Sequence, residues 1–270
     1  FGAFHRWDGI FPFTYSHDDE FRPQKISNYF DVQSNTTRLA HMPACAAMFL
    51  RGDVSGARRT VSAGLSPELE REKLRQTLTP QSLTADSLGL DPRLSLLHAM
   101  AVDLNGKATT DIPKLDENTK VFVSDTSQLR WDTSQDRAGY FTADTPRAKL
   151  FTGFVAGRTF QLGKVSIQIG PTRLDWATIS MVALDADSFA SPGRILIAAT
   201  GWSQNTGKVP EEVGTDRITL SNQWGEEPIL CEGIPALIQL PVKPGQVTFY
   251  ALDQSGNRRD PVPVNTLNGQ

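Results

Sequence analysis

The feature that most limits the fold is a series of nine short apolar or β-branched runs after about residue 118, separated by glycine, proline, asparagine and aspartate. Residues 165–169, reading VSIQI, alternate apolar and polar side chains, so one face of this run is apolar. Such runs at spacings of roughly 8 to 20 residues predict an antiparallel β-sandwich. The predicted strands are residues 121–124, 139–142, 151–155, 165–169, 177–184, 194–200, 217–220, 236–240 and 247–252.

A helical pattern precedes this region. Residues 36–51, reading TTRLAHMPACAAMFLR, place apolar side chains at helical spacing, with Thr36 or Thr37 as the N-cap. Gly52 provides the stop signal. Pro43 lies inside the pattern, where it removes a hydrogen bond and bends the axis, so two short helices are the alternative to one.

The connecting region between these two patterns contains one further helix and one ambiguous stretch. Residues 66–78 predict a surface helix, because Ser and Pro open it and most of the following residues are charged. Residues 83–104 fit either a buried strand or a helix, and we favour a strand over residues 96–104. The polar stretch between residues 104 and 120 is the expected domain boundary.

Residues 7–17, reading WDGIFPFTYSH, form the most apolar stretch near the start of the sequence. The stretch is too apolar for an exposed hairpin and too short for a membrane span, so it predicts a buried strand. The polar and aromatic residues 15–20 that end it resemble those that line a site at the carboxyl end of a barrel strand. Because a buried strand needs neighbours, we expect residues 1–60 to pack onto the sandwich, to pair with another copy, or to contact a segment upstream.

Composition and charge exclude several partners. The chain is 39% hydrophobic and 21% charged, with a net charge of −3 and a pI of about 5.8. This is a globular composition without the basic surface that nucleic acid or an anionic membrane requires. We also expect no membrane span, since no apolar run reaches ~18 residues.

The common cofactor and nucleophile motifs do not occur in the sequence. Cys45 and Cys231 lie outside any CxxC or Cys/His cluster, so two free, buried thiols are expected and the compartment stays open. Neither GxGxxG nor GxxxxGK[ST] occurs, and no ligand spacing predicts a metal site, so we expect no cofactor. Residues 201–205, GWSQN, lack the last glycine of a GxSxG nucleophile elbow.

Three tryptophans are candidate sugar-binding residues, because flat aromatic rings stack on the apolar faces of sugars. Trp131, Trp202 and Trp224 each stand beside polar, loop-like residues. The polar neighbours that would supply hydrogen bonds are Asp132, Gln204 and Asn205. The competing interpretation places each ring in the sandwich core, and Trp176 is expected there.

The four histidines allow different interpretations. For His17 and the acidic residues 18–20, a solvated loop is favoured over sugar contact, and a metal site ranks last. His5, His41 and His98 are isolated in the sequence, so we expect structural roles for them.

The opening 54 residues, from FGAFHRWDGIFPFTYSH through FDVQSNTTRLAHMPACAAMFLRGDV, resemble the last βα unit of bacterial glycoside hydrolases with the clan A (β/α)8 barrel. In that resemblance residues 1–6 end the seventh helix, where Trp7 packs, residues 9–14 are the eighth strand, and residues 36–51 are the closing helix. VFVSDTSQLRWDTSQDRAGYFTADTPRAKLFTGFVAG and IAATGWSQNTG are similar to the β-sandwich that follows the barrel. The implied parts are residues 1–60, the barrel unit; 61–117, a connecting region with a helix and an early strand; and 118–270, the sandwich.

The resemblance implies a mainly β chain with a small α/β part, in which the sandwich follows one barrel strand and two or three helices. Retaining enzymes of this clan hydrolyse β-linked polysaccharides with two glutamates about 5 Å apart. Both positions would precede Phe1, so no catalytic residue is expected in this chain. Eighth-strand residues commonly face the sugar, which makes Tyr15 and His17 candidate substrate-binding residues and Ser16 a weaker one.

Three functions therefore remain open. The first is the C-terminal region of a polysaccharide-degrading glycoside hydrolase, with carbohydrate and the upstream barrel, or another copy of the chain, as partners. The second is a non-catalytic carbohydrate-binding or structural module that uses the three tryptophans. The third is a self-sufficient hydrolase in which Asp18, Asp19 or Glu20 does acid/base work. The resemblance alone favours a secreted or periplasmic location.

Overall fold

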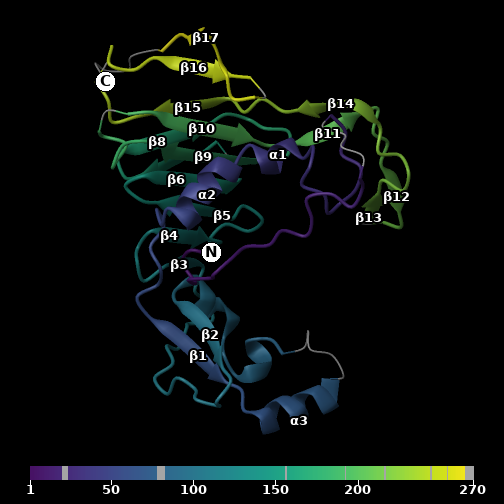
Figure 1. Cartoon of the computed structure of the whole chain (residues 1–270), viewed down its shortest axis with the longest axis vertical. Coiled ribbons are helices and arrows are strands. Elements are labelled where there is room, and N and C mark those ends of the chain that lie inside the picture. The colour runs from purple at the N-terminus through teal and green to yellow at the C-terminus, as the bar shows by residue number, and fades with distance from the viewer. Residues whose placement is uncertain are drawn as a thin grey trace.

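The fold is described from a computed structural model (Figure 1) that covers residues 1–19, 24–77, 83–155, 157–191, 193–215, 217–243, 245–253 and 255–264. It is mainly β, with 33% of residues in strands and 12% in helices, and it contains several antiparallel sheets, as the sequence predicts. Within these residues no helix is both long and apolar enough to cross a membrane.

A six-stranded antiparallel sheet, the main sheet, forms the centre of the molecule (Figure 1). Its order is β10-β9-β6-β5-β4-β3. On β9, Ile179 and Met181 face one side and Ser180 and Val182 the other, and all four are buried. Both faces of the main sheet are therefore covered. The strands are β3 (Val121–Val123), β4 (Leu129–Asp132), β5 (Tyr140–Asp144), β6 (Ala148–Phe154), β9 (Trp176–Ala183) and β10 (Ile195–Thr200).

A three-stranded antiparallel sheet covers one face of the main sheet. It consists of β15 (Ala236–Gln239), β8 (Val165–Ile169) and β7 (Thr159–Leu162), in that order. Val165 and Ile167, apolar positions of the predicted alternation, are fully buried and pack with Ile179 and Met181 of β9. The alternation in β8 therefore decides which of its faces enters the core.

Two short helices cover the opposite face, α1 (Thr36–Leu39) and α2 (Met42–Leu50). Pro43 lies in the first turn of α2, so of the two alternatives the break into two helices is the observed one. The N-cap prediction is wrong by one residue, because the side chain of Asn35 accepts the hydrogen bond from Arg38 N. Gly52 follows α2 with φ +73°, as expected of a helix stop.

Phe4 anchors the start of the chain to this face. Its side chain is fully buried among Ala44 and Met48 of α2 and Val182 of β9. Its carbonyl oxygen accepts a hydrogen bond from Ala57 N at 2.8 Å. Of the three arrangements expected for residues 1–60, the structure therefore shows packing onto the main sheet for Phe4 and α2. Contact with another copy or with an upstream segment stays a prediction for the exposed residues.

A small α/β part lies below the main sheet in Figure 1, and its strands fall at residues 60–103, outside the barrel strand that the resemblance implies at residues 9–14. Its strands β1 (Thr60–Gly64) and β2 (Ala99–Asp103) pair in parallel, and α3 (Pro67–Thr77) lies between them in sequence. Both α3 and β2 fall within the stretches where the sequence predicts a surface helix and a strand. Two 3-10 helices, η2 (Asp86–Leu88) and η3 (Pro92–Leu96), complete a separate apolar cluster centred on Val61 and Leu94.

Three hairpins extend from these layers. The strands β11 (Ser203–Thr206) and β14 (Glu226–Cys231) pair beside α1, and β12 (Glu211–Val213) pairs with β13 (Arg217–Thr219) at the tip of the same arm (Figure 1). The third hairpin joins β16 (Phe249–Leu252) and β17 (Arg258–Val262) near the C-terminal end.

The predicted buried strand over residues 9–14 is wrong. These residues form no strand, and the side chains of Phe11 and Phe13 are 92% and 72% exposed. No neighbouring strand pairs with them in the described chain, so an extended segment here has no ladder to join. The residues that precede them, 2–6, form turns, and Trp7 is largely exposed.

Two further predictions of burial are also wrong. Cys45 and Cys231 are free, as expected, but both are exposed. Cys231 Sγ lies 2.8 Å from Thr36 Oγ1, at the junction of β14 and α1. Trp176 is partly exposed, because it opens β9 at the rim of the sheet and packs edge-on against Phe154 with ring centroids 5.0 Å apart.

His41 joins the helices to the main sheet and makes stability depend on pH. Its buried ring nitrogens lie 2.7 Å from Ser180 Oγ and 2.8 Å from Thr200 Oγ1. Burial lowers the pKa of His41, so between its folded and unfolded pKa values the unfolded chain binds a proton that the native state does not. The free energy of unfolding is therefore expected to fall as the pH drops below about 6.5.

Urea unfolding at about pH 7.5 and about pH 5.5 checks this expectation. Burial also lowers the pKa of His5 and that of the Phe1 amino group, so the wild-type chain carries further contributions of the same sign. His41→Gln removes one of them, and its loss of stability over this pH interval is expected to be smaller. Equal losses in the wild type and the variant would contradict the assignment.

Candidate functional site

Two groups of ring contacts, together with the exposed ring of Tyr15, are termed the aromatic surface. The first group is Phe13, His17 and Phe30, and the second is Tyr29 and Trp224, beside the β11–β14 hairpin. Val32 N donates to Thr14 O, and Gln33 N donates to Tyr15 O, both at 3.0 Å. The chain therefore doubles back on itself and brings the segment before residue 18 beside the segment after residue 28.

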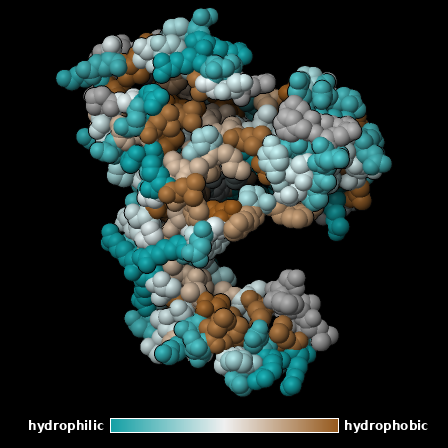
Figure 2. All heavy atoms as spheres, viewed as in Figure 1, coloured by the Kyte–Doolittle hydropathy of each residue, from teal (hydrophilic) through white to brown (hydrophobic). Residues whose placement is uncertain are grey.

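Figure 2 shows the molecule hollowed on the side where this segment lies, between the arm that ends in β12 and β13 and the small α/β part. The purple N-terminal stretch in Figure 1 borders the hollow on its way to the β11–β14 hairpin. Four rings of the aromatic surface, those of Phe13, Tyr15, Tyr29 and Phe30, are more than half exposed.

A buried carboxylate orients His17. Asp31 is 2% exposed, and its Oδ1 lies 2.7 Å from Nδ1 of His17, whose side chain is 44% exposed. The backbone N–H of His17 also donates to Oδ1 and Oδ2 of Asp31, at 3.2 and 3.3 Å. Because an ionised carboxylate only accepts, Nδ1 carries the proton, and Nε2 is left for other contacts.

The ionised state of Asp31 follows from its contacts. Burial by itself raises the pKa of a carboxyl group, but the hydrogen bonds from His17, together with that of Asn28, outweigh burial and hold the pKa of Asp31 below its usual value. Asn28 Oδ1 also accepts from Phe30 N and Asp31 N, at 2.8 and 3.0 Å. The turn at residues 28–31 is therefore fixed by side chains that also position His17.

The rings pack edge to face, which leaves their outer faces open. Phe13 lies edge-on to His17 and to Phe30, with centroid distances of 5.1 and 5.9 Å. Tyr29 lies edge-on to Trp224, with centroids 4.6 Å apart. Aromatic pairs favour this geometry, so the rings fix one another while several of them remain more than half exposed.

Asn205 connects the aromatic surface to the β11–β14 hairpin. Its side chain is 2% exposed; Oδ1 accepts from Ile26 N at 2.9 Å, and Nδ2 donates to Ile26 O at 2.7 Å. Nδ2 also donates to Trp224 O at 2.8 Å. Asn205 was a candidate sugar partner, but these bonds and its burial make it a structural residue that holds both segments of the surface.

Trp131 and Trp202 lie away from the aromatic surface. Trp131 is on β4 of the main sheet, where Phe122 and Phe141 are its partners on the neighbouring strands. Trp202 is half-buried before β11, and the guanidinium of Arg173 lies 3.9 Å from its ring centroid. Of the three candidate tryptophans, Trp224 belongs to the aromatic surface, through its ring contact with Tyr29.

The polar candidates occupy different places. Asp132 is buried and accepts hydrogen bonds from Ser134, Arg130 and Tyr140, which makes it a structural residue. Gln204 pairs with Leu230 across the β11–β14 hairpin.

The acidic loop after His17 is only partly described. Asp18 and Asp19 are exposed, whereas Glu20 lies outside the described residues. Where the structure describes side chains, no group of three or more His, Cys, Asp or Glu residues has the arrangement of a metal site.

Sequence reasoning missed Phe13, Tyr29, Phe30 and Asp31 as site residues. The signal available in the sequence was the cluster NYFD at residues 28–31, in which two aromatic residues stand between a turn-forming Asn and an Asp.

Comparison of the chain with protein-family models, curated proteins and solved structures finds no match.

Proposed function

We propose that this chain is the carbohydrate-contacting region of a polysaccharide-degrading glycoside hydrolase, and that the aromatic surface is its sugar-binding site. The observation that carries the proposal is the set of exposed rings beside His17 and Trp224. Phe13, Tyr15, Tyr29 and Phe30 are 72, 59, 60 and 57% exposed, although each carries a large apolar ring.

The chemistry of this surface suits a sugar chain. Pyranose rings have apolar faces, which stack on aromatic side chains, and hydroxyl groups at their edges, which hydrogen-bond. The rings supply the stacking surface, while Nε2 of His17 and the hydroxyl groups of Tyr15 and Tyr29 supply hydrogen bonds. A site of this kind binds a flexible ligand with little loss of side-chain entropy, because its rings are already fixed by one another and by Asp31.

The exposed stretch at residues 10–15 supports a region of a larger enzyme over an independent binding module. Ile10 is 52% exposed and Phe11 is 92% exposed. Apolar stretches of this kind in soluble proteins are usually covered by a partner surface. In the proposal residues 9–12 meet the barrel that contains the catalytic glutamates, and the adjoining aromatic surface, which begins at Phe13, continues the substrate path.

Affinity electrophoresis against soluble glucan, mannan and xylan tests the proposal. At least one polysaccharide is expected to retard the wild-type chain, and Phe30→Ala, Trp224→Ala and His17→Ala are each expected to weaken that affinity about two- to tenfold. Trp131→Ala is the matched control, because Trp131 is a partly exposed aromatic residue on the main sheet.

The control variant is expected to bind like the wild type. Absence of retardation on all three polysaccharides would contradict the proposal. A loss in Trp131→Ala that equals the loss in Trp224→Ala would move the sugar site to the main sheet.

A further inference from the structure

The strand β10 lies at the edge of the main sheet, although its sequence is that of an interior strand. It reads ILIAAT, with apolar residues on both faces and no charge. Edge strands in native proteins usually carry a charged residue, a proline or a covering segment that prevents further pairing. The sequence of β10 contains none of these residues, so this edge is suited to accept a partner strand.

The hydrogen-bond register shows which way the backbone of β10 points. Leu184 N donates to Arg194 O at 2.8 Å, so the carbonyl of Arg194 faces β9. Ala183 N, one residue back, donates to Arg147 O at 2.9 Å on the other side of β9. Ala183 is also the register partner of Ile195. The pair formed by Ala183 and Ile195 is therefore one that does not exchange hydrogen bonds.

Alternation along the strand assigns the remaining residues. Leu196 and Ala198 bond to β9, as Arg194 does, whereas Ile195, Ile197 and Ala199 direct their backbone N–H and C=O groups away from it. These three residues thus present a row of backbone donors and acceptors at the edge of the main sheet.

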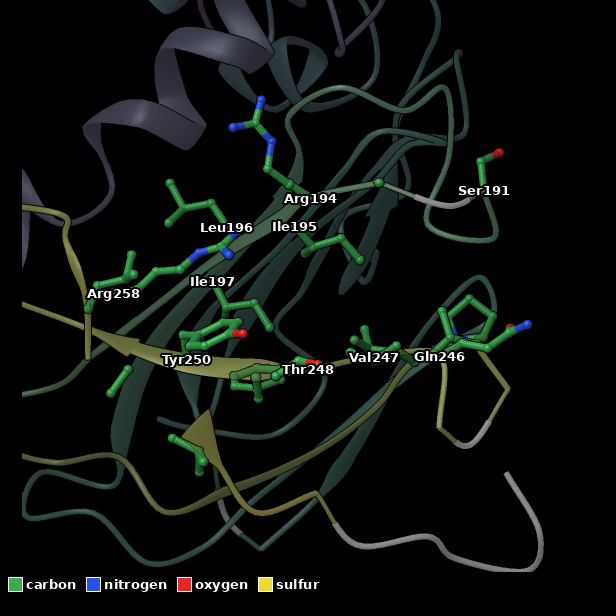
Figure 3. A pocket seen from close by; sticks show the side chains of 18 of the residues that line it. Ser191, Arg194, Ile195, Leu196, Ile197, Gln246, Val247, Thr248, Tyr250 and Arg258 are labelled. Carbon is green, nitrogen blue, oxygen red and sulfur yellow. The ribbon is translucent and has the colours of Figure 1, made fainter. Parts of the chain in front are cut away.

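A cavity of about 1010 Å³ lies beside this edge. Ile195, Ile197 and Ala199 line it from β10, and Thr248 and Tyr250 line it from the stretch that includes β16. Figure 3 shows the side chains of Ile195 and Ile197 extending from β10 toward Thr248 and Tyr250. The cavity is at the upper end of the size range of ligand sites, roughly 300–1,000 Å³, and its walls are mostly apolar.

The charged groups at the cavity are all cationic. Arg194, Lys243 and Arg258 are among its lining residues, and its described lining contains no carboxylate. Arg194 is already paired with Asp185 at 2.7 Å, and the guanidinium of Arg258 lies 4.6 Å from the ring centroid of Tyr250. Lys243 is exposed. The lining therefore favours an occupant with negative charge.

We propose that this cavity binds an extended peptide segment that pairs with the free edge of β10, with alternating apolar side chains and acidic residues at its ends. The outward backbone groups of Ile195, Ile197 and Ala199 supply the pairing, and the apolar walls receive every second side chain. Lys243 and Arg258 meet the acidic ends. This site is separate from the aromatic surface and does not rest on the proposed sugar binding.

Fluorescence anisotropy with a labelled synthetic peptide, acetyl-EVTVTVTVE-amide, tests the proposal on the whole chain. Saturable binding is expected. The same peptide with N-methyl groups on its valines, which alternate with threonine, loses its edge hydrogen bonds. A second peptide, with lysine in place of glutamate, loses the charge complementarity. Each is expected to bind at least about tenfold more weakly.

Two variants locate the site. Ala199→Pro removes an N–H that β9 does not use, so it is expected to fold and to weaken peptide binding about tenfold. Ala199→Val keeps that N–H and is the matched control. Soluble polysaccharide is expected not to displace the peptide.

Several results would overturn the proposal. The first is that the unmodified peptide does not bind the wild-type chain. The second is that the N-methylated peptide binds with equal affinity, and the third is that a folded Ala199→Pro variant binds the peptide with unchanged affinity. Equal affinity for the N-methylated peptide would identify the cavity as a site for small apolar ligands instead. Because the peptide comparisons use the wild-type chain, they decide the question even if Ala199→Pro does not fold.

Discussion

Replacement of Phe4 by alanine is expected to lower the free energy of unfolding by about 3–5 kcal/mol, the largest effect of any substitution considered for this chain. Phe4 is 0% exposed and lies between α2 and β9, with Ala44, Met48 and Val182 around it. Its removal leaves a cavity that the two layers close only in part. Urea unfolding followed by circular dichroism measures the loss.

Phe1→Ala is the matched control for this prediction. Phe1 is 47% exposed and stacks on Phe141 with centroids 5.8 Å apart, so its truncation is expected to cost about 1 kcal/mol or less. A Phe4→Ala variant within about 0.5 kcal/mol of the wild type would mean that the start of the chain does not pack on the main sheet in solution.

Ionisation of Asp132 is expected to have the second large effect on the free energy of unfolding, and this effect appears at acid pH. Although burial alone would raise the pKa of this carboxyl group, hydrogen bonds from Ser134, Arg130 and Tyr140 lower it from 3.8 to about 2. A lowered carboxyl pKa stabilises the native state above the unfolded pKa. The contribution, about 2 kcal/mol, is expected to be complete above about pH 5 and to disappear as the pH falls through about 2.

Unfolding of the wild type and of Asp132→Asn over this pH range checks the prediction. The wild type is expected to be the more stable at about pH 5, and the difference is expected to shrink on acidification. Asp136→Asn controls for the change in net charge, because Asp136 is exposed on the same loop. A difference that stays constant over the whole range would assign the stability of Asp132 to something other than its ionisation.

The elements that sequence analysis predicted most accurately are those in which local pattern decides burial. The bounds of β8 coincide with the predicted run, because one polar and one apolar face leave a single way to place VSIQI against the main sheet. Pro43 likewise marks the break between α1 and α2, since a proline tolerates the first turn of a helix and not its interior.

The strand β4, which sequence analysis missed, depends on its neighbouring strands and not on its own pattern of side chains. In β4, Arg130 and Trp131 are adjacent and both exposed, so the strand shows no alternation. It exists because β3 and β5 pair with it on both sides. The opposite error occurs at residues 9–14, where an apolar run has no partner strand and remains an exposed segment.

The candidate site was predictable only in part for the same reason. Tyr15, His17 and Trp224 are recognisable from residue type. Tyr15 and His17 lie in one segment of the chain, whereas Trp224 meets the segment after residue 28 through Tyr29. Asp31 was missed because it lies 14 positions after His17 in the sequence, and their contact depends on how the chain folds. Asn205 was singled out as a sugar partner from its residue type, but burial gives it a different role.

The bonds that Asn205 makes have a consequence for the motion of the surface. One side chain connects the backbone at Ile26, the backbone at Trp224 and the strand β11 to which it belongs. Opening of the β11–β14 hairpin is therefore expected to release the Tyr29 and Trp224 rings in the same event, as one cooperative unit. A ligand that orders the rings thereby slows amide exchange in the hairpin, even at residues that it does not touch.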